Sequence, residues 1–225
     1  MNMSRVDLHC HTSASFDGVA APDAVVARAV ERGLTHLAIT DHDTLDGALR
    51  AVDEAPEGLH VIVGCEVSTP EGDLVFAFLR QALPRGLSAR EAIAAGREQG
   101  ALVGIPHPFD RTRRSLLCDP ANEVLASEVD WIEASNGRVA TDAVNRQAAR
   151  LVQKLGAPGV GASDAHTLLE VGTAWTSMEG DPSTPDGLLA ALHGPMTIMG
   201  LAAKPPEGPL ERLLEPTKRR FRMAR

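Results

Sequence analysis

The chain alternates short apolar segments with amphipathic segments along most of its 225 residues. Runs such as 35–40 and 60–65 have the character of buried strands, whereas 22–33 and 141–156 carry apolar residues at helical spacing. Strands that alternate with helices build a mainly parallel sheet, either open or closed into a barrel. We therefore expect an α/β fold with one domain over residues 1–204. A Pro-rich and then basic tail follows over 205–225.

One connection departs from this alternation. Residues 67–72 link two predicted strands and are too few for a helical crossover, so we expect a hairpin there. Such a hairpin would bring Asp73, at the start of the fourth strand, back beside Glu66, at the end of the third.

Composition narrows the classes of partner. The net charge is −8, and because residues 218–225 carry five cations, the rest of the chain holds −13. An acidic body lacks the basic stripe of a nucleic-acid surface, and 3% aromatic residues do not favour a base-stacking platform. We therefore expect no stable nucleic-acid complex. No apolar run is long enough to span a bilayer, and three cysteines without a disulfide pattern indicate the cytoplasm.

Imidazoles and carboxylates follow the predicted strands at their C-terminal ends. They are His9 and His11, His42, Glu66, His107, and Asp164 with His166. Residues two apart in a strand point the same way, so His9 and His11 can form a clamp. Parallel βα barrels build their sites at this end of the strands, so we expect these side chains to converge. Such ligands without thiolates suit zinc, iron or manganese, and Glu66 could bridge two ions.

Five short segments resemble a known family. Residues 7–12 (DLHCHT), 39–44 (ITDHDT), 64–66 (GCE), 107–108 (HP) and 163–166 (SDAH) are similar, in order and spacing, to the motifs of the PHP (polymerase and histidinol phosphatase) family. The resemblance implies a distorted, TIM-like barrel of seven βα units. It also implies a hydrolase of phosphoesters that uses two or three divalent ions.

The resemblance implies three ligand sets: His9, His11, Glu66 and Asp164 for one ion; Glu66, His107 and a fourth-strand residue for a second; and Asp17, His42 and His166 for a third. The fourth-strand position departs from the pattern, because Asp73 stands where many members have histidine. Aspartate is shorter and anionic, so it would favour a harder ion such as manganese and weaken the second site.

Other residues are expected to support these ligands or the substrate. Asp41, and with less reason Asp7, could accept the spare N–H of a ligating imidazole, and Asp41 is assigned a catalytic role on that ground. Arg138 and Arg111 follow predicted strands and are assigned to bind the substrate phosphate. The arginines at 113 and 114 are expected to be solvated surface charges.

The leading hypothesis is a metal-dependent phosphoesterase that hydrolyses a small phosphorylated metabolite or nucleotide through a metal-bridging hydroxide. One alternative is an exonuclease-like phosphodiesterase that trims nucleic-acid ends. Another is an amidohydrolase or deaminase, which also uses His-x-His barrels. A non-enzymatic alternative is a PHP module that serves as a scaffold. The oligomeric state is left open.

Overall fold

The computed structural model of the chain describes residues 3–139 and 141–200, so the predicted tail lies outside the described residues. One sheet of nine strands runs through it in the order β7-β6-β5-β4-β3-β2-β1-β8-β9. The strands are β1 (Met3–Asp7), β2 (His36–Ile39), β3 (His60–Ser68), β4 (Asp73–Ala77), β5 (Leu102–Ile105), β6 (Trp131–Asn136), β7 (Gly159–Ala162), β8 (Ala174–Glu179) and β9 (Met196–Gly200).

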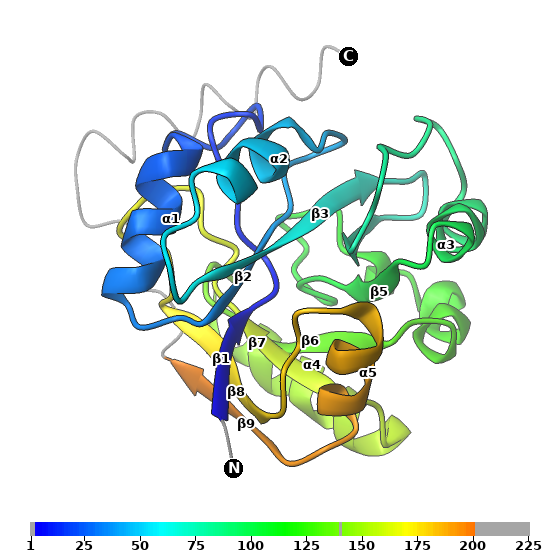
Figure 1. Cartoon of the computed structure of the whole chain (residues 1–225). Helices are drawn as coiled ribbons and strands as arrows, with labels where there is room; N and C mark the ends of the chain where they lie inside the picture. The colour runs from blue at the N-terminus through cyan, green and yellow to red at the C-terminus, as the bar shows by residue number, and fades with distance from the viewer. Residues whose placement is uncertain (1–2, 140, 201–225) are drawn as a thin grey trace.

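Helices cover the outside of this sheet (Figure 1). They are α1 (Pro22–Glu31), α2 (Asp46–Asp53), α3 (Ala89–Glu98), α4 (Asp142–Leu155), α5 (Pro185–Leu192), and the 3₁₀ helices η1 (Leu116–Cys118) and η2 (Pro120–Ser127). Local sequence explains several boundaries. Ser88 and Glu91 form a capping box at the start of α3, and Gly156 ends α4 in the left-handed conformation that glycine adopts readily.

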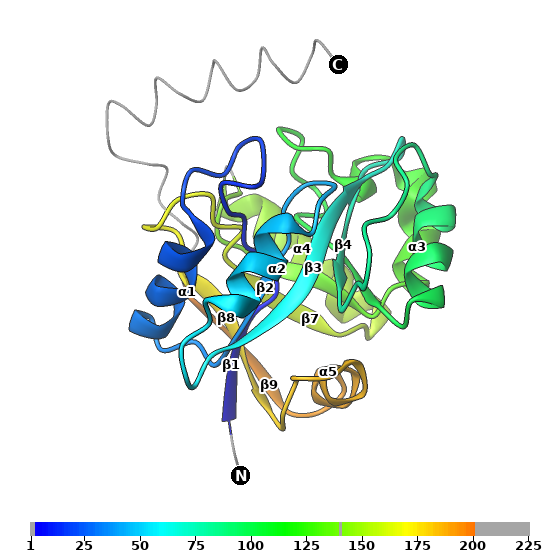
Figure 2. The same ribbon diagram turned by 45° about the horizontal axis from the view of Figure 1, so that its top comes forward.

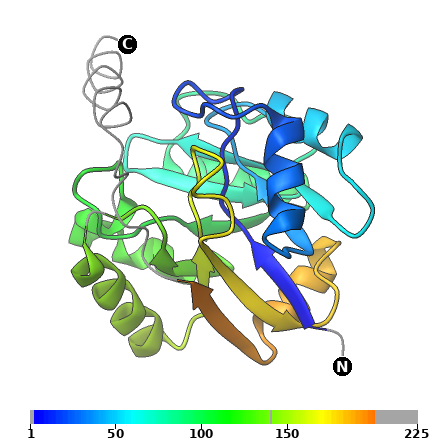
Figure 3. The same ribbon diagram turned by 90° about the vertical axis from the view of Figure 1, so that its left-hand side faces the viewer.

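The sheet curls into a nearly closed barrel (Figure 3). β7 meets β8 through Thr176, whose Oγ accepts from Gly161 N at 2.8 Å and donates to Gly161 O at 3.2 Å. β2 pairs parallel with both β1 and β3, and β6 pairs parallel with both β5 and β7. β4, β8 and β9 run antiparallel to their neighbours. The predicted single α/β barrel is confirmed, and β8 and β9 complete the wall between β7 and β1.

The predicted hairpin is present. β3 and β4 pair antiparallel, with Ser68 opposite Asp73 and Glu66 opposite Val75. This register returns Asp73 to the same end of the barrel as Glu66, where the loops that follow the parallel strands also gather (Figure 2).

The first strand is shorter than expected. β1 ends at Asp7, so His9 and His11 lie in an extended segment beyond it rather than in the strand. That segment is held between two loops, because His11 N donates to Ala165 O and Thr40 N donates to Cys10 O, both at 2.8 Å. Cys10 and Cys65 are fully buried in apolar clusters.

Candidate metal centre

The structure brings all nine predicted ligand residues together at one end of the barrel. Their ligand atoms form three groups, each with atoms within 4.8 Å of one another: His9, His11 and Asp164; Glu66, Asp73 and His107; and His11, Asp17, His42 and His166. These residues come from segments more than 150 positions apart, and the barrel closure is what makes them neighbours.

The first group is the most deeply buried. The Nε2 atoms of His9 and His11 are 2.9 Å apart, and each lies 3.6 Å from Asp164 Oδ1. Glu66 Oε2 lies 3.5 Å from His9 Nε2 and 3.4 Å from His11 Nε2. All four side chains are at most 2% exposed.

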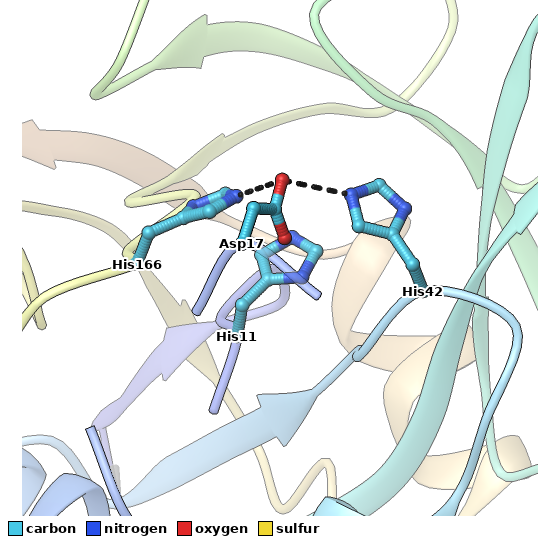
Figure 4. A group of neighbouring side chains, drawn as sticks. All are labelled: His11, Asp17, His42 and His166. Atoms are coloured by element: carbon cyan, nitrogen blue, oxygen red, sulfur yellow. Dashed lines mark ion pairs between the residues drawn. The ribbon is translucent and has the colours of Figure 1, made fainter. Parts of the chain in front are cut away.

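The loop between β1 and α1 supplies His11 and Asp17 to the third group, while His42 follows β2 and His166 follows β7. Figure 4 shows Asp17 Oδ2 between two imidazoles, 3.5 Å from His42 Nε2 and 3.2 Å from His166 Nε2. The ring of His11 packs against both, with centroids 4.8 Å from His42 and 4.2 Å from His166. His11 therefore belongs to two of the groups, whereas the predicted ligand sets placed it in only one.

Glu66 connects the groups. Its Oε2 faces His9, His11 and also His42 Nδ1 at 3.2 Å, while its Oε1 lies 3.1 Å from His107 Nε2. One carboxylate that turns its two oxygens toward different imidazoles has the geometry of a bridging ligand. Asp73 completes the second group and is paired with Arg114 Nε at 3.2 Å.

Partners on the far side of three rings, those of His9, His107 and His166, orient these imidazoles. Glu133 Oε1 lies 2.7 Å from His9 Nδ1, and Glu133 Oε2 accepts from His107 N at 2.8 Å. His107 Nδ1 lies 3.0 Å from Ser115 Oγ, and His166 Nδ1 lies 2.9 Å from the carbonyl of Asp164. Such partners fix which ring nitrogen carries the proton and leave the other free to ligate. Sequence reasoning missed Glu133, whose only signal is an acidic residue inside an apolar strand.

Two aspartates hold backbone instead of imidazoles, which corrects their predicted contacts. Asp41 accepts from Thr12 N and Thr12 Oγ, both at 2.7 Å, and Asp7 Oδ1 accepts from the backbone N–H groups of His9 and Ser163. The paths of the segments after β1 and β7 bring these N–H groups within hydrogen-bond distance of the two short side chains. Asp41 thus anchors the loop that carries Asp17, and among the described residues it accepts no hydrogen bond from an imidazole.

The arginines also differ from expectation. Arg113 is only 17% exposed at its side chain and donates to Asp164 Oδ2 at 2.7 Å, so its assignment as a solvated charge is wrong. Arg114 reaches Asp73 from a more exposed position, with its side chain 44% exposed. Arg138 lies at the rim with Nε 3.4 Å from Glu170 Oε1, while Arg111 is exposed. The turn that follows Asp110 directs Arg113 inward.

The electrostatics follow from dense packing of unlike charges. Burial alone would lower the pKa of His9, but the carboxylates of Asp164, Glu133 and Glu66 outweigh it and raise that pKa well above its usual value. Burial, reinforced by the neighbouring imidazoles, lowers the pKa of His11 well below its usual value. Burial opposes protonation of His42 too, yet Glu66 and Asp17 raise its pKa to about 9.

The backbone is strained at two of these residues. His107 has φ of 29° and Asp164 has φ of 52°, a region that non-glycine residues rarely adopt. Strain of this kind persists where the surroundings over-determine it, and it gathers at functional sites.

The residues fit divalent ions. Asp164 Oδ1 is buried and accepts no hydrogen bond from the described residues, although Asp164 Oδ2 accepts from Arg113 and Asn136. That oxygen faces two imidazole nitrogens at 3.6 Å, close to the roughly 3.4 Å between ligands around one tetrahedral ion. Oxygen and nitrogen donors without thiolates match zinc, manganese or iron.

A βα barrel with imidazoles and carboxylates at the ends of its strands defines a class of metal-dependent hydrolases. Within that class, the chain belongs to the PHP domain family, whose profile matches residues 7–134, and a PHP-associated profile matches residues 143–194. The family resemblance of the motifs is thereby confirmed. In the described residues we find no helix with the length and apolarity to cross a membrane.

Individual relatives agree with this placement. An uncharacterized protein of Methanocaldococcus jannaschii is 31% identical over 166 residues, which cover 67% of this chain and 95% of the relative. Among solved structures, a two-domain protein of Bacteroides vulgatus described as containing a PHP-like metal-dependent phosphoesterase superposes with a TM-score of 0.74 and 19% identity, covering 88% of this chain and 65% of that one. The lesion-specific endonuclease PfuEndoQ of Pyrococcus furiosus superposes with a TM-score of 0.68 and 19% sequence identity. The match covers 89% of this chain and 59% of the endonuclease.

Proposed function

We propose that this member of the PHP family hydrolyses a phosphate ester of a small metabolite or nucleotide with the help of two or three divalent ions. The observation that carries the proposal is the position of Glu66, which faces imidazoles of all three ligand groups. Zinc, manganese or iron held by the nine ligand residues would activate water and neutralise the phosphoryl oxygens. The three cysteines are free, which supports the expected cytoplasmic location.

The chain's own residues would position the reactants. Glu133 and Ser115 hold the rings of His9 and His107, and Arg113 and Asn136 hold Asp164 so that Oδ1 points into the site. Arg138, at the rim beside Glu170, is the proposed contact for the phosphate, and Arg111 is a more exposed second candidate. Asp41 supports the site through Thr12, and the proposal gives it no contact with substrate.

The first test is the number of ions per chain, counted by mass spectrometry on protein purified without chelator or affinity nickel. Three ions, followed by phosphate release from a panel of phosphomonoesters, would support the proposal. Two ions would indicate that Asp73 is a weak ligand, and Asp73→His should then restore the third. A folded protein that takes up no manganese or zinc would contradict the proposal and favour a non-catalytic scaffold.

A second candidate is a phosphodiesterase that acts on nucleic-acid ends. Phe16 favours it, because this side chain is 60% exposed beside Asp17 and stacks on His42 with centroids 4.9 Å apart. An exposed aromatic ring at a site entrance suits base stacking, which the low aromatic content had not led us to expect. The fold shared with an endonuclease is compatible with this candidate. Hydrolysis of mononucleotides with no activity on oligonucleotides would rule it out.

A further inference from the structure

Three consecutive residues at the end of the loop between β5 and η1 each contact a different ligand residue of the metal centre. The contacts are Arg113 with Asp164 Oδ2 at 2.7 Å, Arg114 Nε with Asp73 Oδ1 at 3.2 Å, and Ser115 Oγ with His107 Nδ1 at 3.0 Å. The first contact concerns the first ligand group. The other two concern the second group, of which Glu66 is the remaining member.

The backbone of this segment is fixed against the β3–β4 hairpin. Asp73 N donates to Arg114 O at 2.7 Å, and Asp73 forms a parallel bridge with Ser115. Gly72 allows this close approach, because a Cβ there would lie 2.9 Å from Arg114 O and 2.6 Å from Leu116 Cα. Asp73 is therefore held by both the carbonyl and the guanidinium of Arg114.

The guanidinium of Arg114 spans the turn of the hairpin. Its Nε donates to Asp73 Oδ1, and its Nη2 donates to the carbonyl of Thr69. Thr69 is itself fixed, because its Oγ donates to Gly72 O at 2.6 Å and accepts from Gly72 N at 3.2 Å. A planar guanidinium that uses two donors in this way holds the carboxylate in one orientation, which a point charge does not do.

Charge adds to the importance of this contact. Asp73 is 1% exposed and shares its ligand group with Glu66, so two buried carboxylates lie close together. Buried charges are costly unless they are paired. Arg114, whose side chain is 44% exposed, brings a positive charge from the rim of the barrel to Asp73. Without it, repulsion from Glu66 should turn the short side chain of Asp73 away from the second group.

His107 does not depend on Arg114 in the same way. Ser115 Oγ donates to the carbonyl of His107, so the hydroxyl accepts from His107 Nδ1–H and leaves the lone pair on Nε2. That Nε2 lies 3.1 Å from Glu66 Oε1. Within the second group, Asp73 is thus the ligand whose orientation Arg114 controls.

We propose that Arg114 is a positioning residue for the second ligand group, which holds the carboxylate of Asp73 so that it binds an ion together with Glu66 and His107. The inference rests on the proposed metal-dependent function. It adds a residue that acts through Asp73 and decides whether the second group is filled. The sequence had led us to expect a solvated charge at position 114.

Manganese binding to the full chain tests the proposal. Protein stripped with chelator is titrated with Mn²⁺, and free manganese is measured by electron paramagnetic resonance. Asp73→Asn identifies the ion of the second group as the one whose affinity it lowers. Arg114→Met should raise the dissociation constant of that ion by about 10- to 100-fold and leave the other ions unchanged. Arg114→Lys should raise it less, because the ammonium keeps the charge but does not reach Asp73 and Thr69 together.

A double-variant cycle separates positioning from general destabilisation. In the Asp73→Asn background, Arg114→Met should have no further effect, because no carboxylate remains to be held. Arg85→Met, which removes an exposed arginine between β4 and α3, is the matched control and should bind manganese as the wild type does. An unchanged dissociation constant in Arg114→Met would overturn the proposal. So would an equal loss of affinity in the Asp73→Asn background.

Failure of this inference can be told apart from failure of the proposed function. A wild type that shows these differences in affinity but releases phosphate from no ester would contradict the proposed function and support the role of Arg114. A wild type that binds ions in the other groups and leaves the second group unfilled at high manganese would overturn the role of Arg114 alone.

Discussion

Glu133 is a buried carboxylate whose two oxygens serve different ligands, one at the ring of His9 and one at the backbone of His107. We expect Glu133→Gln to keep the hydrogen bond to His107 N but to lose the anionic acceptor for His9 Nδ1–H. The affinity for zinc should then fall by about 10- to 100-fold. Competition with a chelating dye measures this change.

Glu128→Gln is the matched control for that variant. Glu128 is also a glutamate near β6, but it pairs with Arg90 at the surface, at 2.8 Å. Its substitution should therefore leave the affinity for zinc unchanged. Equal affinities in Glu133→Gln and the wild type would show that His9 needs no carboxylate behind it.

Arg138 provides a second prediction at this scale. Because the proposal places its guanidinium against the substrate phosphate and not at an ion, Arg138→Ala should raise KM for a phosphomonoester by about tenfold. The number of bound ions should stay the same. Arg146→Ala, which removes an exposed arginine of α4, is the control. An unchanged KM in Arg138→Ala would remove this residue from the binding site.

Single residues show where sequence reasoning succeeds. The nine residues that gather at one end of the barrel could be named as candidate ligands because imidazoles and carboxylates that follow strands have few structural reasons to be there. Asp41 was assigned the wrong contact and Arg113 the wrong environment, because both depend on the path of a loop. Glu133 was missed, since no pattern tells which ring a buried strand residue will face.

Helix α2 packs its first turn against the loop that carries Asp17. A Cβ at Gly47 would lie 1.9 Å from Asp41 Oδ2 and 2.3 Å from Thr12 Oγ, so any side chain there displaces this pair. We expect Gly47→Ala to lower the free energy of unfolding by about 1–3 kcal/mol, despite the better helix propensity of alanine. The substitution should also lower the affinity for the ion that Asp17 would hold. Urea unfolding and ion counting test both expectations.

Gly194→Ala is the control, because a Cβ there would meet Ala191 O at an ordinary 3.5 Å. If Gly47→Ala is as stable as Gly194→Ala and binds as many ions, the packing of α2 does not support the loop.

The elements were predictable where periodicity was strong and less so at their ends. The barrel strands, the hairpin over 67–72 and the capping box of α3 follow from apolar runs and cap residues. The end of β1 at Asp7 did not follow, because the next residues pair with loops that only the closed barrel brings near. Residues 120–127 form a 3₁₀ helix, η2, whose tighter winding no apolar periodicity indicates.

For the molecule as a whole, stability without metal should depend on pH. The pKa of His42 is raised from 6.5 to about 9, so its pairing with Glu66 and Asp17 stabilises the ion-free fold fully below pH 6.5. That contribution is lost as the pH rises through about 9. The melting temperature of chelated protein should therefore fall between pH 6.5 and 9, as measured by calorimetry.

Loading with zinc should remove this fall, since a ligating imidazole carries no proton on the coordinating nitrogen. His42→Asn should show a flatter profile than the wild type in chelator. A melting temperature that rises with pH in the ion-free wild type would contradict the assignment of the raised pKa to this pairing.

The place of β1 between β2 and β8 bears on how the protein is made. Met3 pairs with Glu179, 176 positions later, while Asp164 N donates to the backbone carbonyl of His9. A chain that leaves the ribosome from its N-terminus exposes His9, His11 and His42 long before β8 is synthesised. Contacts so distant in sequence form late. The nascent chain therefore carries three of its eight histidines as exposed groups that could chelate a metal, and selection among the cell's competing metals would fall to the last stage of folding.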